Sequence, residues 1–395
     1  MASQESQADQ IIRKLTQLAP DLSGDDAAAV RKEVVGLSRQ LTVTLEQPEN
    51  TALEVGFAPL ITTAARIAVQ LNLFKYITDN NGPITLKELA IASGAEELLI
   101  VRMLRPLAAI GFVREVAIKI WEATPITKVM ATEEIAAGYR YMGQLIAGPT
   151  TQAPKYFAEA GYRCPTDPRD GLMQYGLHAK LTVFELLASM PNTFKDFNTF
   201  MGNTMGARQY WVDWYPIETS VIDGATDESA LLVDVAGGKG HDILAFHAKY
   251  PGRGRLVLED LPAVVKAAGS IGPSIETVGY NFFTEQPVKG ARAYFYHHIL
   301  HDWSDDKCLE ILGKVKKAMK PGYSKLLIHE MVVPEKGAST FHGILDLTMM
   351  IFNAGIERTE SQWKDLMKRA GLKVTGVWHA PQEGADGIVE VMVEE

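Results

Sequence analysis

The sequence predicts an α/β protein whose C-terminal part is a doubly wound, mostly parallel sheet, preceded by an α-helical region of winged-helix type. From Leu231 onward, short apolar runs alternate with helix-forming runs, which is the pattern of a parallel sheet with helices on both faces. Between residues 55 and 115 the order is helix, helix and short hairpin, which favours a winged helix. The chain is therefore expected to hold at least two structural regions.

Composition limits the classes of partner. The 395 residues exceed one average domain, and 47% hydrophobic with 22% charged residues is typical of a protein with a buried core. A net charge of −9 argues against binding nucleic acid through phosphates, so a small-molecule partner is expected. The two cysteines fit neither a zinc nor a disulfide pattern. With a polar N-terminus and no apolar run of about 18 residues, the sequence predicts a cytoplasmic protein without a membrane partner.

Residues 1–50 are predicted to form an N-terminal helical extension. Ile11, Ile12, Leu15 and Leu18 recur at helical spacing, and residues 27–45 are rich in helix formers. An apolar stripe outside the main core must be covered. The sequence leaves open whether the rest of the same chain or a second subunit covers this stripe.

Residues 51–135 are predicted to be the winged-helix-like region. One helix is expected through residues 64–77, and a capping box at Thr85 and Glu88 opens the next. Residues 96–123 then supply a second short helix and a strand-like segment. The presumed recognition helix offers two arginines among apolar residues and two glutamates, a poor surface for phosphates. A packing or dimerisation role is therefore favoured over a DNA-binding regulator.

Residues 136–225 are predicted to be helical with intervening loops, and residues 226–395 to form the sheet region. In the second region LLVDV at residues 231–235 is the first strand. Further strand-like runs occupy residues 255–260, 275–283, 291–300, 324–333, 372–380 and 387–395. In such a sheet, ligands bind at the carboxyl ends of the strands.

A glycine-rich loop follows the first predicted strand. Gly237, Gly238 and Gly240 allow a tight turn and close approach of a ligand, and Asp260 at the end of the next strand can accept both hydroxyls of a ribose. The loop misses the G-x-G-x-x-G spacing of an NAD-dependent dehydrogenase. An acid inside the strand, Asp234, suits a ligand with an ammonium group and no phosphate. This combination favours S-adenosylmethionine.

The segment YHHILHDWSDD at residues 296–306 concentrates ionisable groups where a strand gives way to a helix. Ser304 is expected to cap that helix, and the two acids after it suit the positive first turn. On an extended strand His297 and His301 share one face and His298 opposes them, and no third ligand is evident, so no metal is expected. A histidine with a carboxylate on its other ring nitrogen can act as a general base.

Five segments carry a family resemblance: LVDVAGGKG, LEDLP, ARAYFYHHILHDWSDDKCLEIL, LLIHEMVVPE and GIERTESQW. In this order they resemble the motifs of small-molecule O-methyltransferases of the plant caffeate type and their fungal secondary-metabolism relatives, from about residue 55 to the C-terminus. CPTDPRDG and the helical run after it resemble the fungal branch. The resemblance implies a Rossmann-like class I methyltransferase sheet at 226–395, a dimerisation domain at 51–135, an acceptor pocket drawing on 136–225, and a homodimer.

The resemblance also implies residue roles. The methionine end of S-adenosylmethionine is expected at Asp234 and the glycines of its loop, the ribose at Asp260, and the adenine at Asn281 and Phe282, where the family commonly has an acid in place of Asn281. His297 is expected at the margin of the cofactor. His301 is expected as general base, oriented by Glu330 or Glu357. The acceptor pocket is expected to include Phe197, Met201, Met349 and Asn353.

The function that follows is methyl transfer from S-adenosylmethionine to a phenolic or enolic hydroxyl of an aromatic or polyketide-like small molecule. An alternative keeps the cofactor but catalyses a non-methylating reaction, such as a pericyclic rearrangement or a dehydration, because fold and cofactor do not fix chemistry. Retention of His301, Glu330 and Glu357 favours methyl transfer. The identity of the acceptor, and which glutamate orients His301, are left open.

Overall fold

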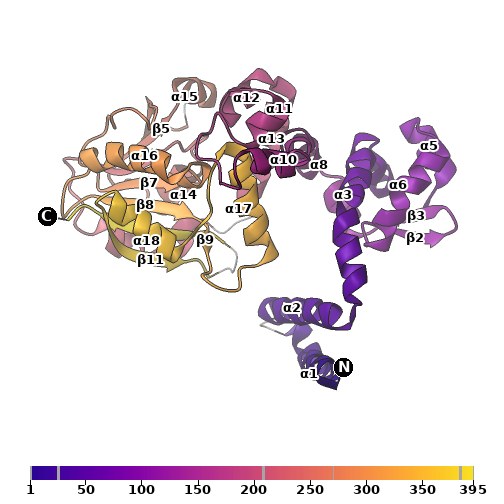
Figure 1. Cartoon of the computed structure of the whole chain (residues 1–395). Coiled ribbons are helices and arrows are strands. Elements are labelled where there is room, and N and C mark those ends of the chain that lie inside the picture. The colour runs from indigo at the N-terminus through magenta and orange to yellow at the C-terminus, as the bar shows by residue number, and fades with distance from the viewer. Residues whose placement is uncertain (1, 25–26, 207–209, 270, 382–384, 395) are drawn as a thin grey trace. The chain divides into compact units, whose positions relative to one another are not determined.

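The computed structural model describes residues 2–24, 27–206, 210–269, 271–381 and 385–394. It divides into two compact units, an N-terminal unit (Met1–Thr132) and a C-terminal unit (Glu133–Glu395). The helices and strands of both are labelled in Figure 1. The finer boundaries expected near residues 50, 135 and 225 stay predictions. All residues with an expected chemical role belong to the C-terminal unit.

The N-terminal unit begins with helices where the sequence predicts them. Helix α1 spans Ala2–Leu18, a short 3-10 turn follows at Ala19–Ser23, and α2 spans Ala27–Leu45. Helix α3 then runs over Pro48–Gln70, beginning with a proline at a position where its missing N–H costs no hydrogen bond. The predicted helical extension is therefore confirmed as helical.

The single helix expected through residues 64–77 is wrong. Helix α3 ends at Gln70, and a separate α4 spans Leu73–Asp79. Asn72 between them adopts a left-handed backbone, φ 55°, which asparagine tolerates better than most residues and which ends the helical hydrogen-bond ladder. The helical periodicity of the apolar residues does not reveal this break.

The remainder of the N-terminal unit has the elements of a winged helix. These are β1 (Ile84–Thr85), α5 (Leu86–Ser93), α6 (Glu97–Ala109), β2 (Val113–Ala117), β3 (Ile120–Ala123) and α7 (Pro125–Met130). The strands form a sheet of order β1-β3-β2. The predicted capping box is present, because Thr85 Oγ1 accepts from the Glu88 amide and Glu88 Oε2 accepts from the Thr85 amide.

One helix of the described residues, α3, is long and apolar enough to cross a membrane by length and composition. The expectation that no segment reaches this threshold is therefore wrong. It rested on uninterrupted apolar runs, which Glu54 and Arg66 break, whereas hydropathy averaged over the helix passes the test. Exposed apolar side chains on α2 and α3 include Val43, Leu45, Leu53, Val55, Phe57 and Leu60.

The C-terminal unit opens with a helical region, as predicted for residues 136–225. Its helices are α8 (Glu133–Met142), α9 (Gly148–Thr150), α10 (Ala153–Glu159), α11 (Leu172–Leu177), α12 (Val183–Ser189) and α13 (Pro191–Gly206). Their apolar faces share a core with α17 (Thr340–Asn353) through Ile351 and Phe352. A segment late in the chain is thus packed among helices that precede the sheet.

The central sheet has seven strands in the order β11-β12-β8-β7-β4-β5-β6. Their bounds are β4 Ala230–Val235, β5 Arg255–Asp260, β6 Ile275–Gly279, β7 Ala293–His297, β8 Lys325–Glu330, β11 Lys373–His379 and β12 Gly387–Met392. Strands β4 to β8 pair in parallel, and β12 and β11 join antiparallel at one edge. The predicted doubly wound, mostly parallel sheet is confirmed.

Helices cover both faces of this sheet. Helix α16 (Asp305–Ala318) and α18 (Glu360–Arg369) share one apolar core with Tyr294 and Tyr296 of β7, and Figure 1 shows these two helices in front of the strands. Helix α14 (His241–Lys249) shares the other core with Phe295. Successive residues of β7 therefore enter opposite cores, which is the alternation expected of a strand buried on both sides. A short α15 (Pro262–Ala268) follows β5.

The expected side-chain cap of α16 is not made. Ser304 occupies the N-cap position, but its Oγ donates to the carbonyl of Thr166, 2.8 Å away, instead of accepting from the helix. Thr166 belongs to the CPTDPRDG loop, so the serine ties that loop to the start of α16. Asp305 and Asp306 do lie in the positive first turn of α16, as predicted.

Candidate active site

In the glycine loop after β4, the backbone lies closer to neighbouring side chains than a residue with a Cβ would allow. A Cβ on Gly237 would lie 2.5 Å from Asp234 Cγ and 2.5 Å from Leu258 Cδ1. The amide of Gly240 donates to the Gly237 carbonyl at 2.8 Å, which closes the turn into α14. The loop is therefore packed against the ends of β4 and β5, where a cofactor is expected.

Asp234 presents a buried carboxyl group at this loop. The side chain is 1% exposed, and neither of its oxygens makes a hydrogen bond of normal geometry among the described residues, although the Ile243 amide lies near enough to lower its pKa. Burial raises its pKa well above the usual value, and the nearby Asp242 raises it further. A buried carboxylate is stabilised by a cation beside it. The ammonium group of S-adenosylmethionine fits this requirement.

Asp260 ends β5 and is half-buried. Its Oδ2 accepts from the Gly238 amide at 2.8 Å and its Oδ1 accepts from the Leu261 amide at 2.6 Å. Burial raises the pKa of Asp260, while these two backbone bonds oppose the rise. Both oxygens keep a lone pair for a further donor, so a ribose diol fits this carboxylate. The bond to Gly238 joins the two predicted cofactor elements directly.

The other predicted cofactor residues lie at strand ends nearby in the sheet. Asn281 follows β6, and its Oδ1 accepts from the Phe283 amide at 3.0 Å. Phe282 packs edge-on against Trp303. His297 ends β7 with its Nδ1 2.8 Å from Asp242 Oδ2. Burial lowers the pKa of His297, but the charges and hydrogen bonds of Asp242 and Asp386 together outweigh burial and raise it to about 10. The cofactor roles of these three residues stay predictions.

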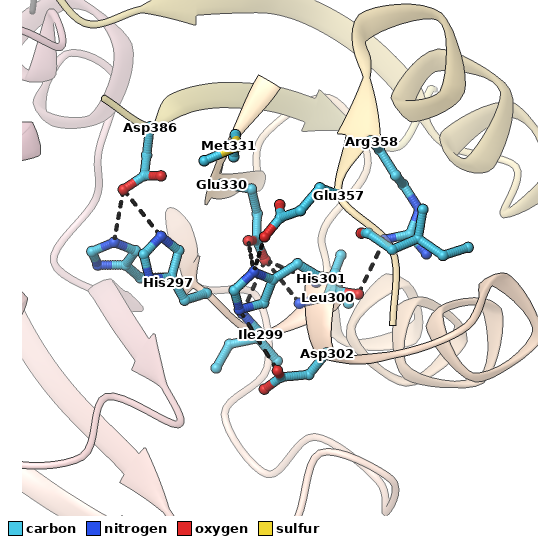
Figure 2. Close-up of polar contacts among 12 residues, drawn as sticks. His297, Ile299, Leu300, His301, Asp302, Glu330, Met331, Glu357, Arg358 and Asp386 are labelled. Carbon is cyan, nitrogen blue, oxygen red and sulfur yellow. Dashed lines mark hydrogen bonds and ion pairs between the residues drawn. The ribbon is translucent and has the colours of Figure 1, made fainter. Parts of the chain in front are cut away.

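His301 lies in a 3-10 turn, Leu300–Asp302, between β7 and α16. Its Nδ1 is 2.9 Å from Glu357 Oε1, and its Nε2 is 3.7 Å from Asp302 Oδ1. Figure 2 shows the imidazole between these acids. A carboxylate on Nδ1 fixes the proton there and leaves the Nε2 lone pair available. Of the two glutamates proposed to orient the ring, Glu357 makes the direct hydrogen bond.

Glu330 supports the backbone of the same turn. Its Oε1 accepts from the amides of Ile299 and Leu300 at 2.9 and 2.8 Å, and from the amide of His301 at 3.3 Å (Figure 2). Its Oε2 lies 3.6 Å from His301 Nδ1, so it also acts on the ring by its charge. One carboxylate thus fixes the turn, whereas Glu357 fixes the tautomer.

A short strand pairing explains how Glu330 and Glu357 come to lie beside each other. Glu330 ends β8. After one intervening residue, Met331, β9 (Val332–Val333) pairs in parallel with β10 (Arg358–Thr359). Glu357 immediately precedes β10, so this short pairing brings it beside the end of β8. The sequence gives no periodic signal for a pairing of two residues in each strand.

The acids control the charge of His301. Burial alone lowers its pKa, but the negative charges of Glu330 and Asp302 and the bond to Glu357 outweigh burial and raise it to about 10. Burial raises the pKa of Asp302 to about 7; the charge of His301 opposes that rise, whereas the two glutamates add to it. The imidazole is therefore protonated over most of the neutral range in the free protein, unless another cation lies nearby.

The expectation that His298 lies on the opposite face from His297 and His301 is wrong. Strand β7 ends at His297, and His298 adopts a left-handed backbone with φ 52°. Its ring stacks on that of His301, with 5.0 Å between ring centroids and 23° between planes. The alternation of a strand cannot be extended past a residue in this conformation.

The same turn gathers more metal-type ligands than the sequence indicates. Atoms of Asp242, His297 and His329, and of His297, His298 and Asp386, lie within 4.8 Å of one another. The statement that no third ligand is evident is therefore wrong. Two close contacts pair these groups with each other, His297 Nδ1 with Asp242 and His298 Nε2 with Asp386 at 3.0 Å. The expectation of no metal stays a prediction.

Two further residues that the sequence did not single out shape this site. A Cβ on Gly355 would lie 2.1 Å from the His301 carbonyl oxygen, so only glycine permits the close approach of this loop. The buried Arg358 donates to the carbonyls of Leu300 and Trp303. Both fix the turn from the side of the Glu357 segment. Gly355 is the first residue of the segment GIERTESQW, but a single glycine there gives no signal of a contact with the His301 turn.

The predicted acceptor residues fall on two helices of the C-terminal unit. Phe197 on α13 stacks on Phe352 of α17, with centroids 5.9 Å apart, and Met201 packs in the same cluster. Asn353 ends α17 and its Nδ2 donates to the Asp302 carbonyl at 3.1 Å. Met349 lies one helical turn before Asn353 and is half-buried. Helix α17, which carries the predicted acceptor residues Met349 and Asn353, is thus hydrogen-bonded to the His301 turn.

Comparison with known proteins bears on this geometry. Residues 217–373 match the O-methyltransferase domain and residues 54–133 the O-methyltransferase dimerisation domain. The chain is 50% identical over 383 residues to the O-methyltransferase penC of Penicillium thymicola, covering 97% of this chain and 96% of that protein. It is 52% identical over 335 residues to the O-methyltransferase asqD of Emericella nidulans, covering 84% and 86%.

The chain belongs to the O-methyltransferase family. Among solved structures, LepI in complex with SAM matches this O-methyltransferase with a TM-score of 0.85 and 29% identity, over 98% of this chain and all of that one. OxaC in complex with SAH and oxaline matches with a TM-score of 0.85 and 25% identity, over 99% and 100%. The family resemblance, the fold class and S-adenosylmethionine as cofactor are confirmed. The protein is a SAM-dependent O-methyltransferase of fungal secondary-metabolite type.

Proposed function

We propose that this O-methyltransferase methylates a phenolic or enolic hydroxyl of an aromatic or polyketide-like small molecule, with His301 as general base. The observation that carries the proposal is the hydrogen bond from His301 to Glu357, which leaves Nε2 as the proton acceptor. Strand β7, which leads to this turn, pairs with β4, which leads to the glycine loop. The proposed base and the cofactor loop therefore follow the ends of two neighbouring strands.

The chemistry requires few groups from the protein. S-adenosylmethionine, when bound, supplies a methyl group on a sulfonium that oxygen attacks in line. A phenol with a pKa of about 10 is mostly protonated at neutral pH, and His301 Nε2 accepts its proton as the oxygen attacks. Asp234 and Asp260 hold the cofactor, and the apolar side chains of α13 and α17 align the acceptor. Phe197, Met201, Met349 and Asn353 are the residues that we assign to the acceptor.

The rate should rise with pH because the base must be unprotonated. The free protein holds the pKa of His301 at about 10. A cationic cofactor nearby opposes protonation, so we expect the ascending limb of kcat below that value but above the ordinary 6.5. Below the limb the rate should fall tenfold for each pH unit. Initial rates at saturating cofactor between pH 6 and 10 measure this limb.

Glu357→Gln separates titration of His301 from titration of the acceptor. Removing this negative charge lowers the pKa of His301, so the limb should move to lower pH while the rate at its plateau falls. Ionisation of the free acceptor hydroxyl also gives a rising limb, in kcat/KM, and the pKa of a molecule in solution does not change with a substitution in the protein. An unchanged limb in Glu357→Gln would assign the titration to the acceptor and count against His301 as base.

Asp260→Ala should weaken cofactor binding. Loss of hydrogen bonds to a charged group costs about 1.5 to 3 kcal/mol, which corresponds to a rise in Kd of about 10- to 150-fold. Isothermal calorimetry with S-adenosylmethionine measures this, and Asp260→Asn, which keeps one acceptor oxygen, should lose less. Wild-type affinity in Asp260→Ala would show that the ribose does not bind there.

A non-methylating reaction is the second candidate, because a structure titled "A Pericyclic Reaction enzyme" matches with a TM-score of 0.84 and 29% identity. The His301 and Glu357 pair favours methyl transfer over a pericyclic rearrangement, since a rearrangement releases no proton for a base to accept. A dehydration also uses a base, so its product must be tested for directly. Methyl-labelled cofactor with a panel of phenolic and enolic acceptors distinguishes the two. Label on oxygen supports methyl transfer, whereas an isomerised or dehydrated product without label supports the alternative.

We propose that the protein is a cytoplasmic homodimer joined through its N-terminal unit. The matched dimerisation domain and the exposed apolar side chains of α2 and α3 support this. Light scattering should give about twice the chain mass of 43.4 kDa, and Phe57→Glu with Leu60→Glu should lower it. A monomer mass for the wild type, or recovery in the membrane fraction, would contradict the proposal.

A further inference from the structure

His298 has an unusual conformation for a residue beside a catalytic turn. It is one of eight non-glycine residues with positive φ in the described chain, and it lies between the end of β7 and the His301 turn. A side chain in the left-handed region is strained, and such strain persists where the surroundings impose it, often at functional sites. The question is what holds His298 in this conformation.

Asp386 is the group that holds it. His298 Nε2 lies 3.0 Å from Asp386 Oδ2, and the carboxylate side chain is only 2% exposed. Asp386 directly precedes β12, whose antiparallel direction places its beginning at the carboxyl edge of the sheet. A buried carboxylate at this distance favours the ring proton on Nε2. Figure 2 shows Asp386 facing His297 at the end of β7.

The ring of His298 lies against the ring of His301, the proposed base. The His298 and His301 rings are nearly parallel, 23° apart, with centroids 5.0 Å apart. The side chain of His298 is 26% exposed and that of His301 13%, so neither ring is fully enclosed by the described residues. Each ring is anchored by a different buried carboxylate, His301 by Glu357 and His298 by Asp386.

We propose that His298, held by Asp386, is a positioning residue that backs the ring of His301 and stabilises it when it becomes protonated. This rests on the proposed function. In the reaction the oxygen–hydrogen bond of the acceptor breaks, its proton goes to His301 Nε2, and the oxygen forms a bond to the methyl carbon as the carbon–sulfur bond breaks. His298 exchanges no proton. Its ring face lies against the cation that forms, an arrangement that aromatic rings stabilise.

Several charged groups act on His301 besides this pair. The titratable groups that face it from the surrounding elements are Asp302 on its own turn, Glu330 from β8, Glu357 before β10 and His298 after β7. Asp386 and His297 lie behind His298, where Asp386 Oδ2 is 3.9 Å from His297 Nε2. Removal of the Asp386 charge should therefore shift the pH limb of His301 downward, less than removal of Glu357.

The test compares four variants of the full-length enzyme. His298→Phe keeps a stacking ring, His298→Ala removes it, Asp386→Asn removes the charge, and His379→Phe makes the same chemical change on an exposed residue of β11. On the plateau of the pH profile we expect kcat in the order wild type, His298→Phe, His298→Ala, with a loss of about 10-fold in the last, as expected for a lost stacking contact in a buried site. Asp386→Asn should move the pH limb to lower pH, and His379→Phe should match the wild type.

Cofactor affinity by calorimetry, expected within twofold of the wild type, shows that each variant is folded. A folded His298→Ala with wild-type kcat and pH limb would overturn the inference, as would His298→Phe with the same loss as His298→Ala. A stoichiometric metal ion, lost in both His298→Ala and Asp386→Asn, would also overturn it because His298 would be a ligand. If His301→Ala itself kept full activity, the proposed base would fail instead.

Discussion

His301→Ala is expected to lower kcat for methyl transfer by at least ~100-fold, the low end of the effect of removing a general base. The ring that would be lost is the one whose Nδ1 is held by Glu357 and whose Nε2 faces away from that bond. Because the contacts of this side chain are with acids and with the ring of His298, affinity for S-adenosylmethionine should change little. Single-turnover rates with labelled cofactor measure the effect on the chemical step.

His301→Gln is the matched variant, since it keeps a polar side chain of similar reach but accepts no proton near neutral pH. It should lose about as much rate as His301→Ala. At high pH, where the acceptor ionises without help, both variants should recover part of the difference. A rate that stays at the wild-type level in either variant, with cofactor bound, would rule out the base assignment.

Glu330→Ala is expected to be the most destabilising single change in the site. It removes the acceptor of the Ile299 and Leu300 amides and of the longer bond from the His301 amide. A buried donor left without a partner costs about 1 to 3 kcal/mol, so two or three of them predict a loss of about 3 kcal/mol or more. Relief of repulsion between Glu330 and its acidic neighbours offsets part of this. Denaturant unfolding followed by near-ultraviolet circular dichroism measures the change.

Glu330→Gln separates the hydrogen bonds from the charge. The amide oxygen can accept the same backbone bonds, so its loss of stability should be about 1 kcal/mol, that of a weakened rather than an absent acceptor. Its loss of negative charge should still lower the pKa of His301 and move the pH limb downward. Equal destabilisation by both variants would show that the charge of Glu330, and not the three amides, is what the fold requires.

Much of the architecture was predictable from local patterns. Alternation of apolar and helix-forming runs predicts the sheet, because each strand and helix must bury its own apolar face whatever its neighbours are. The capping box at Thr85 is equally local. Asp234, the glycines and Asp260 are predictable because successive parallel strands end at one edge of the sheet, and the structure joins Gly238 to Asp260 directly.

Local patterns failed where one residue changes the direction of the backbone. Asn72 divides a helix that apolar periodicity extends through it, and His298 reverses the side of the strand that alternation assigns to it. In both cases a residue in the left-handed conformation ends the regular element, which neither apolar periodicity nor alternation reveals. Ser304 likewise has the sequence of a helix cap but finds a better partner in Thr166.

By itself the sequence determined the fold class, the cofactor and the candidate base, because motifs close in sequence and the period of apolar residues carry that information. Only the tertiary structure decided which acid has which role. Glu357 fixes the tautomer of His301, Glu330 fixes the backbone of the His301 turn, and Asp386 holds His298. These groups come from segments far apart in the chain. Their distances depend on short strand pairings and close backbone contacts, such as that at Gly355, which leave no periodic signal.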